Sequence, residues 1–148
     1  EFLLKKGADI HITDLEKNTL SYYLINSFNA KKPKDFEDKL KMLEQNGLVV
    51  NQIQNSGNTL IQIATERNNL ALLKRLVSFN IDVNSKNKDD LTALQIGAMK
   101  AKDTKIIEYL ISIGADKKVK TAFEESVYDL AAENEILKNK KAKITFLK

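Results

Sequence analysis

The sequence of 148 residues contains no cysteine, one proline, one histidine and five dispersed glycines. The absence of cysteine excludes disulfides, thiolate catalysis and sulfur-based zinc sites, and it is compatible with either redox compartment. No apolar run approaches the roughly 18 residues that a membrane-spanning helix needs, so we expect no membrane span. The dispersed glycines form no phosphate-binding loop.

The net charge is +4, from 24 basic and 20 acidic residues that are largely interspersed. Lys31 and Lys32, for example, are soon followed by Asp35 and Glu37. A nucleic-acid binder usually gathers its positive charge on one face, so we expect no nucleic-acid partner. The lysine-rich tail at 138–143 keeps binding to nucleic acid or an anionic lipid surface open as an alternative.

The sequence offers little material for catalysis. His11 and Asp14 could form a metal-binding or acid–base pair, but no further ligand type stands nearby at a clear spacing. The acidic pair Glu124 and Glu125 falls in a polar stretch, where charge is ordinary solvation. We therefore predict a protein that is not an enzyme and that has no catalytic residue, metal or cofactor.

An internal repeat dominates the sequence. The segments TLIQIA at 59–64 and TALQIG at 92–97 match in type at every position, 33 residues apart. The segment SVYDLA at 126–131 follows 34 residues later, and the weaker TLSYYL at 19–24 precedes the first by 40 residues. Self-similarity at such a period is the signature of a stacked repeat protein.

A second marker recurs at the same intervals. It comprises GADI at 7–10, GLVVN at 47–51, NIDVN at 80–84 and GAD at 114–116. Gly and Asn tolerate the left-handed conformation that ends a helix, so each marker predicts the end of a second helix in its unit. Two independent markers with equal intervals establish the repeat.

Each unit is therefore predicted to contain two helices. Thr59, Thr92 and Ser126 stand at natural N-cap positions, each with Gln or Asp three residues later, which is the capping-box arrangement. In the second helix, apolar residues recur at three- and four-residue spacing, as they do at 70–77 and 106–111. The matched positions Ala64, Gly97 and Ala131 are small, which favours close stacking of the first helices.

These segments resemble the ankyrin repeat family, whose Thr-Pro-Leu-His start, Leu-Leu pair and Gly-Ala-Asp-Val-Asn turn are present here in degraded form. The resemblance implies an all-α ankyrin-repeat solenoid, in which inner helices stack in a row, outer helices lie behind them and hairpin loops project as fingers. We expect one domain over 1–148, with a partial unit at 1–14, units at 15–53, 54–86 and 87–120, and a terminal unit at 121–148. The family's glycine before the Thr survives only as Gly57.

The first full unit contains an insertion. The interval from Thr19 to Thr59 is seven residues longer than the interval from Thr59 to Thr92 (40 against 33), and the excess falls at 28–35, around the only proline, Pro33. Pro33 with acidic residues after it predicts a helix start. The insertion is interpreted as a neutral length variation or as a binding loop.

The start of the chain is also unusual. The chain begins inside an outer helix without an initiator methionine, so we expect a fragment or a processed product in which further residues cover the N-terminal end of the stack.

The resemblance implies a scaffold or recognition role, in which a protein partner binds the surface formed by the fingers and the adjoining ends of the inner helices. We call this surface the concave face. The residues carried over to it are Leu15, Glu16, Asn18, Asn26, Ser27, Asn55, Ser56, Asn58, Glu66, Arg67, Lys88, Asp89, Leu91, Met99, Lys100, Phe123, Glu125, Glu133 and Asn134.

Among these residues we expect Leu91, Met99, Phe123 and Arg67 to contribute most, because apolar, aromatic and Arg side chains supply most interface hot spots. Leu91 and Phe123 could instead pack between adjacent fingers. We expect a monomer. A second hypothesis is a targeting module of a larger protein whose catalytic or membrane part is absent from this sequence. Frequent Lys, Asn and Ile suggest an AT-rich genome and a bacterial source.

Overall fold

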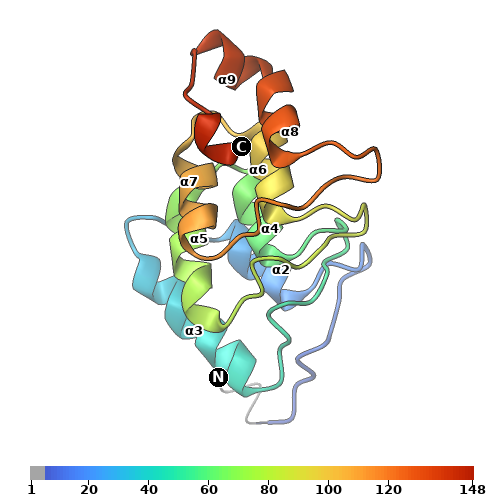
Figure 1. Cartoon of the computed structure of the whole chain (residues 1–148). Helices are drawn as coiled ribbons and strands as arrows, with labels where there is room; N and C mark the ends of the chain where they lie inside the picture. Colours follow the sequence, from blue (N-terminus) through green and yellow to red (C-terminus); the bar gives the residue numbers. More distant parts are fainter. Residues whose placement is uncertain (1–5) are drawn as a thin grey trace.

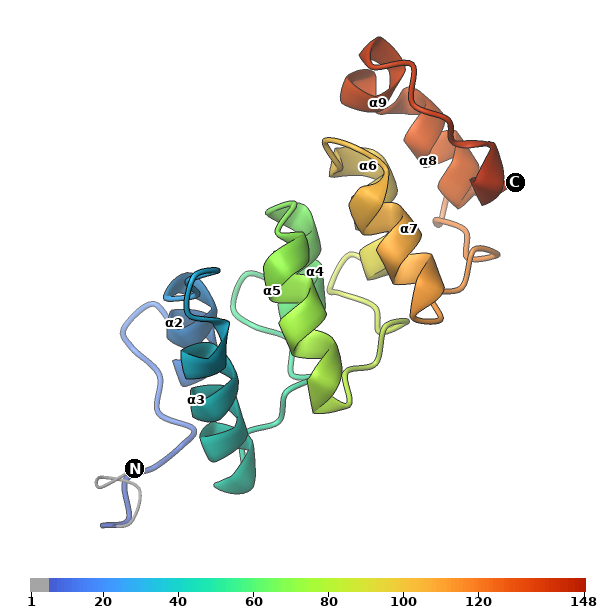
Figure 2. The ribbon, with the colours of Figure 1, turned by 90° about the vertical axis from the view of Figure 1, so that its left-hand side faces the viewer.

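The computed structural model describes residues 6–148 as a row of helix pairs (Figures 1 and 2). The inner row contains α2 (Leu20–Asn26), α4 (Leu60–Glu66), α6 (Ala93–Lys100) and α8 (Val127–Glu133). The outer row contains α3 (Pro33–Gln45), α5 (Leu70–Leu76) with the short helix η1 (Val77–Phe79), α7 (Lys105–Ser112) and α9 (Glu135–Asn139). Residues 6–148 contain no β-strand, so the predicted all-α stack is confirmed. The outer-helix remnant expected at the start falls largely on residues 1–5, outside the described residues.

The core lies between the two rows and between successive pairs. Leu60, Ile61 and Leu94 on the inner helices are at most 1% exposed, and Leu73 and Ile107 on the outer helices are fully buried. Burying one such side chain stabilises the fold by about 1.5–3 kcal/mol. Because each unit buries its apolar side chains against its neighbours, the stack depends on contacts between units. No helix within 6–148 is long and apolar enough to cross a membrane.

The predicted capping boxes are present at three inner helices. The Thr59 amide donates to Gln62 Oε1 at 2.8 Å, and the Thr92 amide donates to Gln95 Oε1 at 2.9 Å. At α8 the Ser126 amide donates to Asp129 Oδ2 at 2.9 Å. These bonds satisfy backbone N–H groups that a helix start otherwise leaves without a partner.

The outer helices end as the Gly and Asn markers predict. Gly47 after α3 and Gly114 after α7 have φ angles of 101° and 98°. Gly7, at the matched position of the partial unit, has a φ angle of 85°. At the matched position Asn80 has φ 47° and ψ 43°, in the left-handed region. The next polar residues then tie neighbouring turns together: Asn51 Oδ1 accepts from the Asp82 amide at 3.0 Å. Asn84 Oδ1 accepts from the Asp116 amide in the same way, at 2.9 Å, so the turns at 47–51, 80–84 and 114–116 are joined by hydrogen bonds.

Hairpin loops, here called fingers, project from the same side of the inner helices at 14–18, 54–58, 87–91 and 121–125 (Figure 1). In each finger the first amide donates to the fifth carbonyl and the fourth amide donates to the first carbonyl. The fourth residue has positive φ whether it is Gly57 at 84° or Asp90 at 61°. The finger backbone is thus the same in units that lack the family's glycine.

The C-terminal tail folds back on the last unit. The short helix η2 (Thr145–Leu147) contacts α8, and Leu147 is 3% exposed. Lys117 Nζ donates to the Phe146 carbonyl at 2.8 Å, and Lys148 Nζ lies 4.8 Å from the centre of the Tyr128 ring. The tail thereby covers apolar surface of the last unit.

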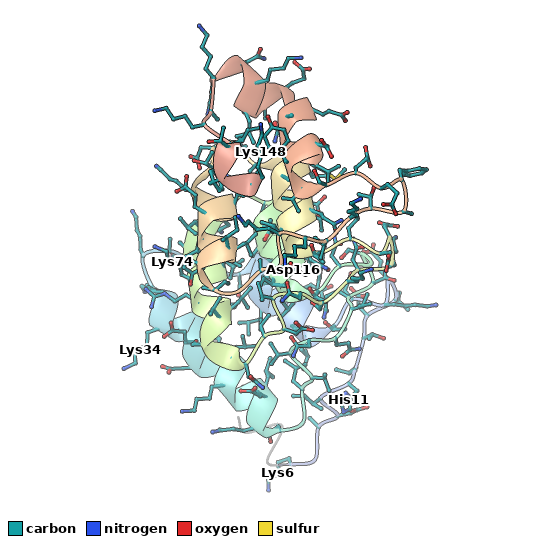
Figure 3. All side chains as sticks on the ribbon, viewed as in Figure 1. Lys6, His11, Lys34, Lys74, Asp116 and Lys148 are labelled. Atoms are coloured by element: carbon teal, nitrogen blue, oxygen red, sulfur yellow. The ribbon has the colours of Figure 1, made fainter. Side chains whose placement is uncertain are left out.

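The insertion at 28–35 joins α2 to α3. Pro33 begins α3, as predicted, and Asp35 lies in its first turn. Phe28 packs edge-on against Phe36, with ring centres 5.3 Å apart. Lys34 of this segment lies on the opposite side of the stack from the fingers (Figure 3). The insertion and the fingers are therefore separate surfaces.

Candidate functional site

Most of the residues expected on the concave face are accessible. Among the four with the strongest expectation, Phe123 is 85% exposed, Met99 is 41% exposed, Arg67 is exposed and Leu91 is half-buried. Phe123 therefore does not pack between fingers. The other exposed members are Leu15, Glu16, Asn26, Ser27, Asn55, Ser56, Glu66, Lys88, Asp89, Lys100 and Glu133, and Asn18, Asn58 and Glu125 are half-buried.

Asn134 departs from the expected surface position. It is 6% exposed, and its side-chain amide donates to the carbonyls of Ala98 and Ala101 at 3.0 and 3.1 Å. Its Oδ1 accepts from the amides of Ile136 and Leu137, which caps the start of α9. Both ends of the side chain are bound within the stack, so Asn134 holds α6 and α9 rather than facing a partner.

Side chains in the fingers hold the loop backbone in place. Asn87 Oδ1 accepts from the amides of Asp89 and Leu91, both at 2.9 Å, and Asn87 Nδ2 donates to Asn58 Oδ1 at 2.7 Å. Asp14 and Thr121 accept from the matched amides of their own fingers. These are the fingers without glycine, so a polar side chain supports the backbone where a non-glycine residue has positive φ.

The first finger is fixed by the carboxylate of Asp14. It accepts from the Asn18 side chain at 2.9 Å and from the Tyr23 hydroxyl on α2. The bond from Tyr23, followed by those from Asn18, lowers the pKa of Asp14 to about 2. The Asp14 carboxylate is thus bound to Asn18 and Tyr23. His11 lies exposed on the preceding segment, and its backbone amide donates to Asp9 Oδ1 (Figure 3). Across 6–148 there is no cluster of three or more His, Asp or Glu side chains arranged to hold a metal ion.

Neighbouring units are joined across the concave face by polar contacts, here called rungs. Arg67 Nη2 donates to Asn26 Oδ1 at 2.6 Å, and Lys100 forms an ion pair with Glu66. Asn58 Nδ2 also donates to the other oxygen of Glu66, at 3.1 Å. The sequence assigned these residues to one surface but did not indicate that they bind one another.

A hollow of about 260 Å³ opens between α6 and α8 on this face. Four of its lining residues were expected on the concave face from the sequence, and the fifth, Leu130, was not. Leu130 is 6% exposed, and its position in the middle of the α8 apolar pattern gave no signal of a partly open site. The residues that line the hollow are Met99, Glu125, Leu130, Glu133 and Asn134.

A second hollow, of about 210 Å³, lies between α2 and the insertion. Its lining includes Ser27, which the sequence had assigned to the concave face, together with Asn29, Lys32 and Asp35. Ser27 Oγ donates to the Leu24 carbonyl at 2.8 Å, which closes α2. Ser27 therefore lies toward the insertion, away from the hollow between α6 and α8.

The sequence matches known proteins. A family model described as "Ankyrin repeats (3 copies)" matches residues 27–121. The ankyrin repeat protein FPV031 of Fowlpox virus (strain NVSL) is 27% identical over 127 residues, which are 84% of this chain and 36% of that protein. The chain thus spans about a third of the length of this relative. The relative is viral and gives no support to the bacterial source suggested by composition.

Proposed function

The chain belongs to the ankyrin repeat family, and we propose that it is a non-catalytic scaffold whose concave face binds a protein partner. Ankyrin repeats are generally protein–protein interaction modules. Fold alone does not determine function, so the proposal depends on the chemistry of this surface. We further propose that the chain acts as a monomer, as one domain with the unit boundaries stated above.

The observation that carries the proposal is the exposure of large apolar side chains on one face. Leu15 in the first finger and Phe123 in the last finger are 105% and 85% exposed, and Met99 beside the hollow is 41% exposed. Exposed apolar groups rimmed by polar residues are typical of interaction sites. The rungs next to Met99 orient the polar rim, since Lys100 and Glu66 already bind each other.

A second candidate is that the stack targets a longer protein to its partner. The greater length of the fowlpox relative favours it, because this chain spans only 36% of that protein. The two candidates share the concave face as the binding surface. They differ in the purpose of binding: in the first candidate the stack is itself the scaffold, and in the second it brings an attached catalytic or membrane part to the partner.

The test begins with a partner captured from the source organism, followed by hydrogen exchange of the chain with and without that partner. We expect protection of the fingers and inner-helix ends at 87–100 and 121–134. Protection confined to the insertion at 28–35 or to the outer helices would contradict the proposal. The basic-surface alternative would be favoured if no protein partner is captured and the chain binds DNA or anionic vesicles in a manner that is lost at high salt.

A further inference from the structure

The rungs follow a fixed register along the inner helices. The acceptors Asn26 and Glu66 both stand seven residues after the helix-capping Thr of their units, and the donors Arg67 and Lys100 stand eight residues after theirs. Each donor reaches back to the acceptor of the preceding unit. A cation in the eighth position therefore pairs with an acceptor in the seventh wherever the sequence supplies both.

The register breaks at the hollow between α6 and α8. The seventh position of the third unit is Met99, whose thioether sulfur is only a weak acceptor, and the eighth position of the last unit is Asn134, which is turned inward. The seventh position of the last unit is Glu133, an acceptor of the same kind as Glu66.

The hollow combines apolar walls with uncompensated negative charge. Met99 and Leu130 form the apolar part, and Glu125 and Glu133 contribute two carboxylates. Thr121 Oγ1 donates to Glu125 Oε2 at 2.8 Å, but neither glutamate has an ion-pair partner among the described residues. An aliphatic stem that ends in a cation complements both features, because its methylene groups cover apolar surface while its charged end stays near solvent.

We infer that the hollow lined by Met99, Glu125 and Glu133 receives an arginine side chain of the protein partner. The guanidinium binds a carboxylate through two N–H groups, and its stem lies along Met99 and Leu130. Charge complementarity selects this occupant over a neutral apolar side chain. The inference rests on the proposed function, since it names the kind of residue with which the partner enters the concave face.

The two methionines provide a direct readout. Labelling with [¹³C-methyl]methionine gives one signal for Met99 at the hollow and one for Met42 on the outer helix α3. The whole chain is titrated with acetyl-Gly-Arg-Gly-amide and, separately, with the uncharged analogue that carries citrulline in place of arginine. We expect a saturable shift of the Met99 methyl with the arginine peptide, a much smaller shift with citrulline and none for Met42.

Substitution of the carboxylate separates the charge from the shape of the hollow. Glu133→Gln should lower the affinity of the chain for the arginine peptide about threefold, as expected for the loss of one exposed ion pair. The matched control is Glu108→Gln, which removes one exposed charge from the outer helix α7 and should change nothing. Equal shifts with both peptides, no saturable shift at Met99, or equal affinity for the wild type and Glu133→Gln would each overturn the inference. If concave-face substitutions still release the protein partner in that case, the proposed function stands and only the arginine assignment fails.

Discussion

Thr65 on α4 and Gly97 on α6 lie in direct apposition. A Cβ atom at Gly97 would stand 3.4 Å from Thr65 Cγ2, and 3.6 Å from Ile107 Cγ1. The space accepts a methyl group but not a branched side chain. The matched residues Ala64 and Ala131 are fully buried, which is consistent with the expectation that small residues favour close stacking of the inner row.

Gly97→Leu and Ala64→Leu should each lower the free energy of unfolding by about 1–3 kcal/mol, because the added atoms overpack the contact between neighbouring inner helices. Gly97→Ala is the control and should be neutral or raise stability by up to about 1 kcal/mol, since alanine favours the helix and fits the space. Thermal melts followed by circular dichroism measure both. Unchanged midpoints for both leucine variants would mean that close stacking does not hold the row together.

Asn80→Val should destabilise the chain by about 1–2 kcal/mol, because a β-branched residue resists the left-handed backbone with φ 47°. Asn80→Gly keeps that conformation available and serves as the matched variant. Urea unfolding of both proteins gives the comparison. Equal stability of the valine and glycine variants would show that the end of the second outer helix does not need this conformation.

Asn87→Ala should cost about 1–3 kcal/mol, because the amides of Asp89 and Leu91 lose their acceptor and Asn58 loses its bond to Asn87. Asp89→Ala changes an exposed residue of the same finger and should leave stability nearly unaltered. Denaturation and limited proteolysis of the finger at 87–91 report the difference. If the two variants behave alike, the side-chain support of this finger is unimportant.

Acid should destabilise the chain partly through Asp14. Its pKa is lowered from 3.8 to about 2 in the folded state, so its contribution is present above pH 3.8 and is lost as the pH falls toward 2. Tyr23→Phe removes the largest cause of the lowered pKa and should reduce the drop in melting temperature between pH 5 and pH 2. An identical drop in the wild type and Tyr23→Phe would contradict the role of this bond.

The fold could be predicted from the sequence because its signals repeat. The capping residues Thr59, Thr92 and Ser126 and the turn residue Asn80 act through local backbone hydrogen bonds and local conformation, which a short segment specifies. The finger backbone was less predictable. Asp90 and Glu124 adopt positive φ in place of glycine, and the side chains that support those fingers stand three residues earlier.

The site was predicted less completely because its details depend on contacts between units. Asn134 shares its register with Arg67 and Lys100, yet it is buried because α9 begins at the very next residue and draws the side chain inward as its N-cap. The rung between Lys100 and Glu66 joins residues 34 positions apart. Neither a short segment nor the repeat period alone indicates which of these side chains turn outward.

The most direct test of the central claim is the affinity of an isolated partner for chains altered on either surface. Met99→Ala or Arg67→Ala, or both, should weaken binding by about 1 kcal/mol or more, while substitution of the exposed insertion residues Asn29, Lys31 and Lys32 by alanine leaves it unchanged. Isothermal titration calorimetry on folded variants measures each affinity. Unchanged affinity for both Met99→Ala and Arg67→Ala, together with loss of binding in the insertion variant, would contradict the claim and assign the site to 28–35.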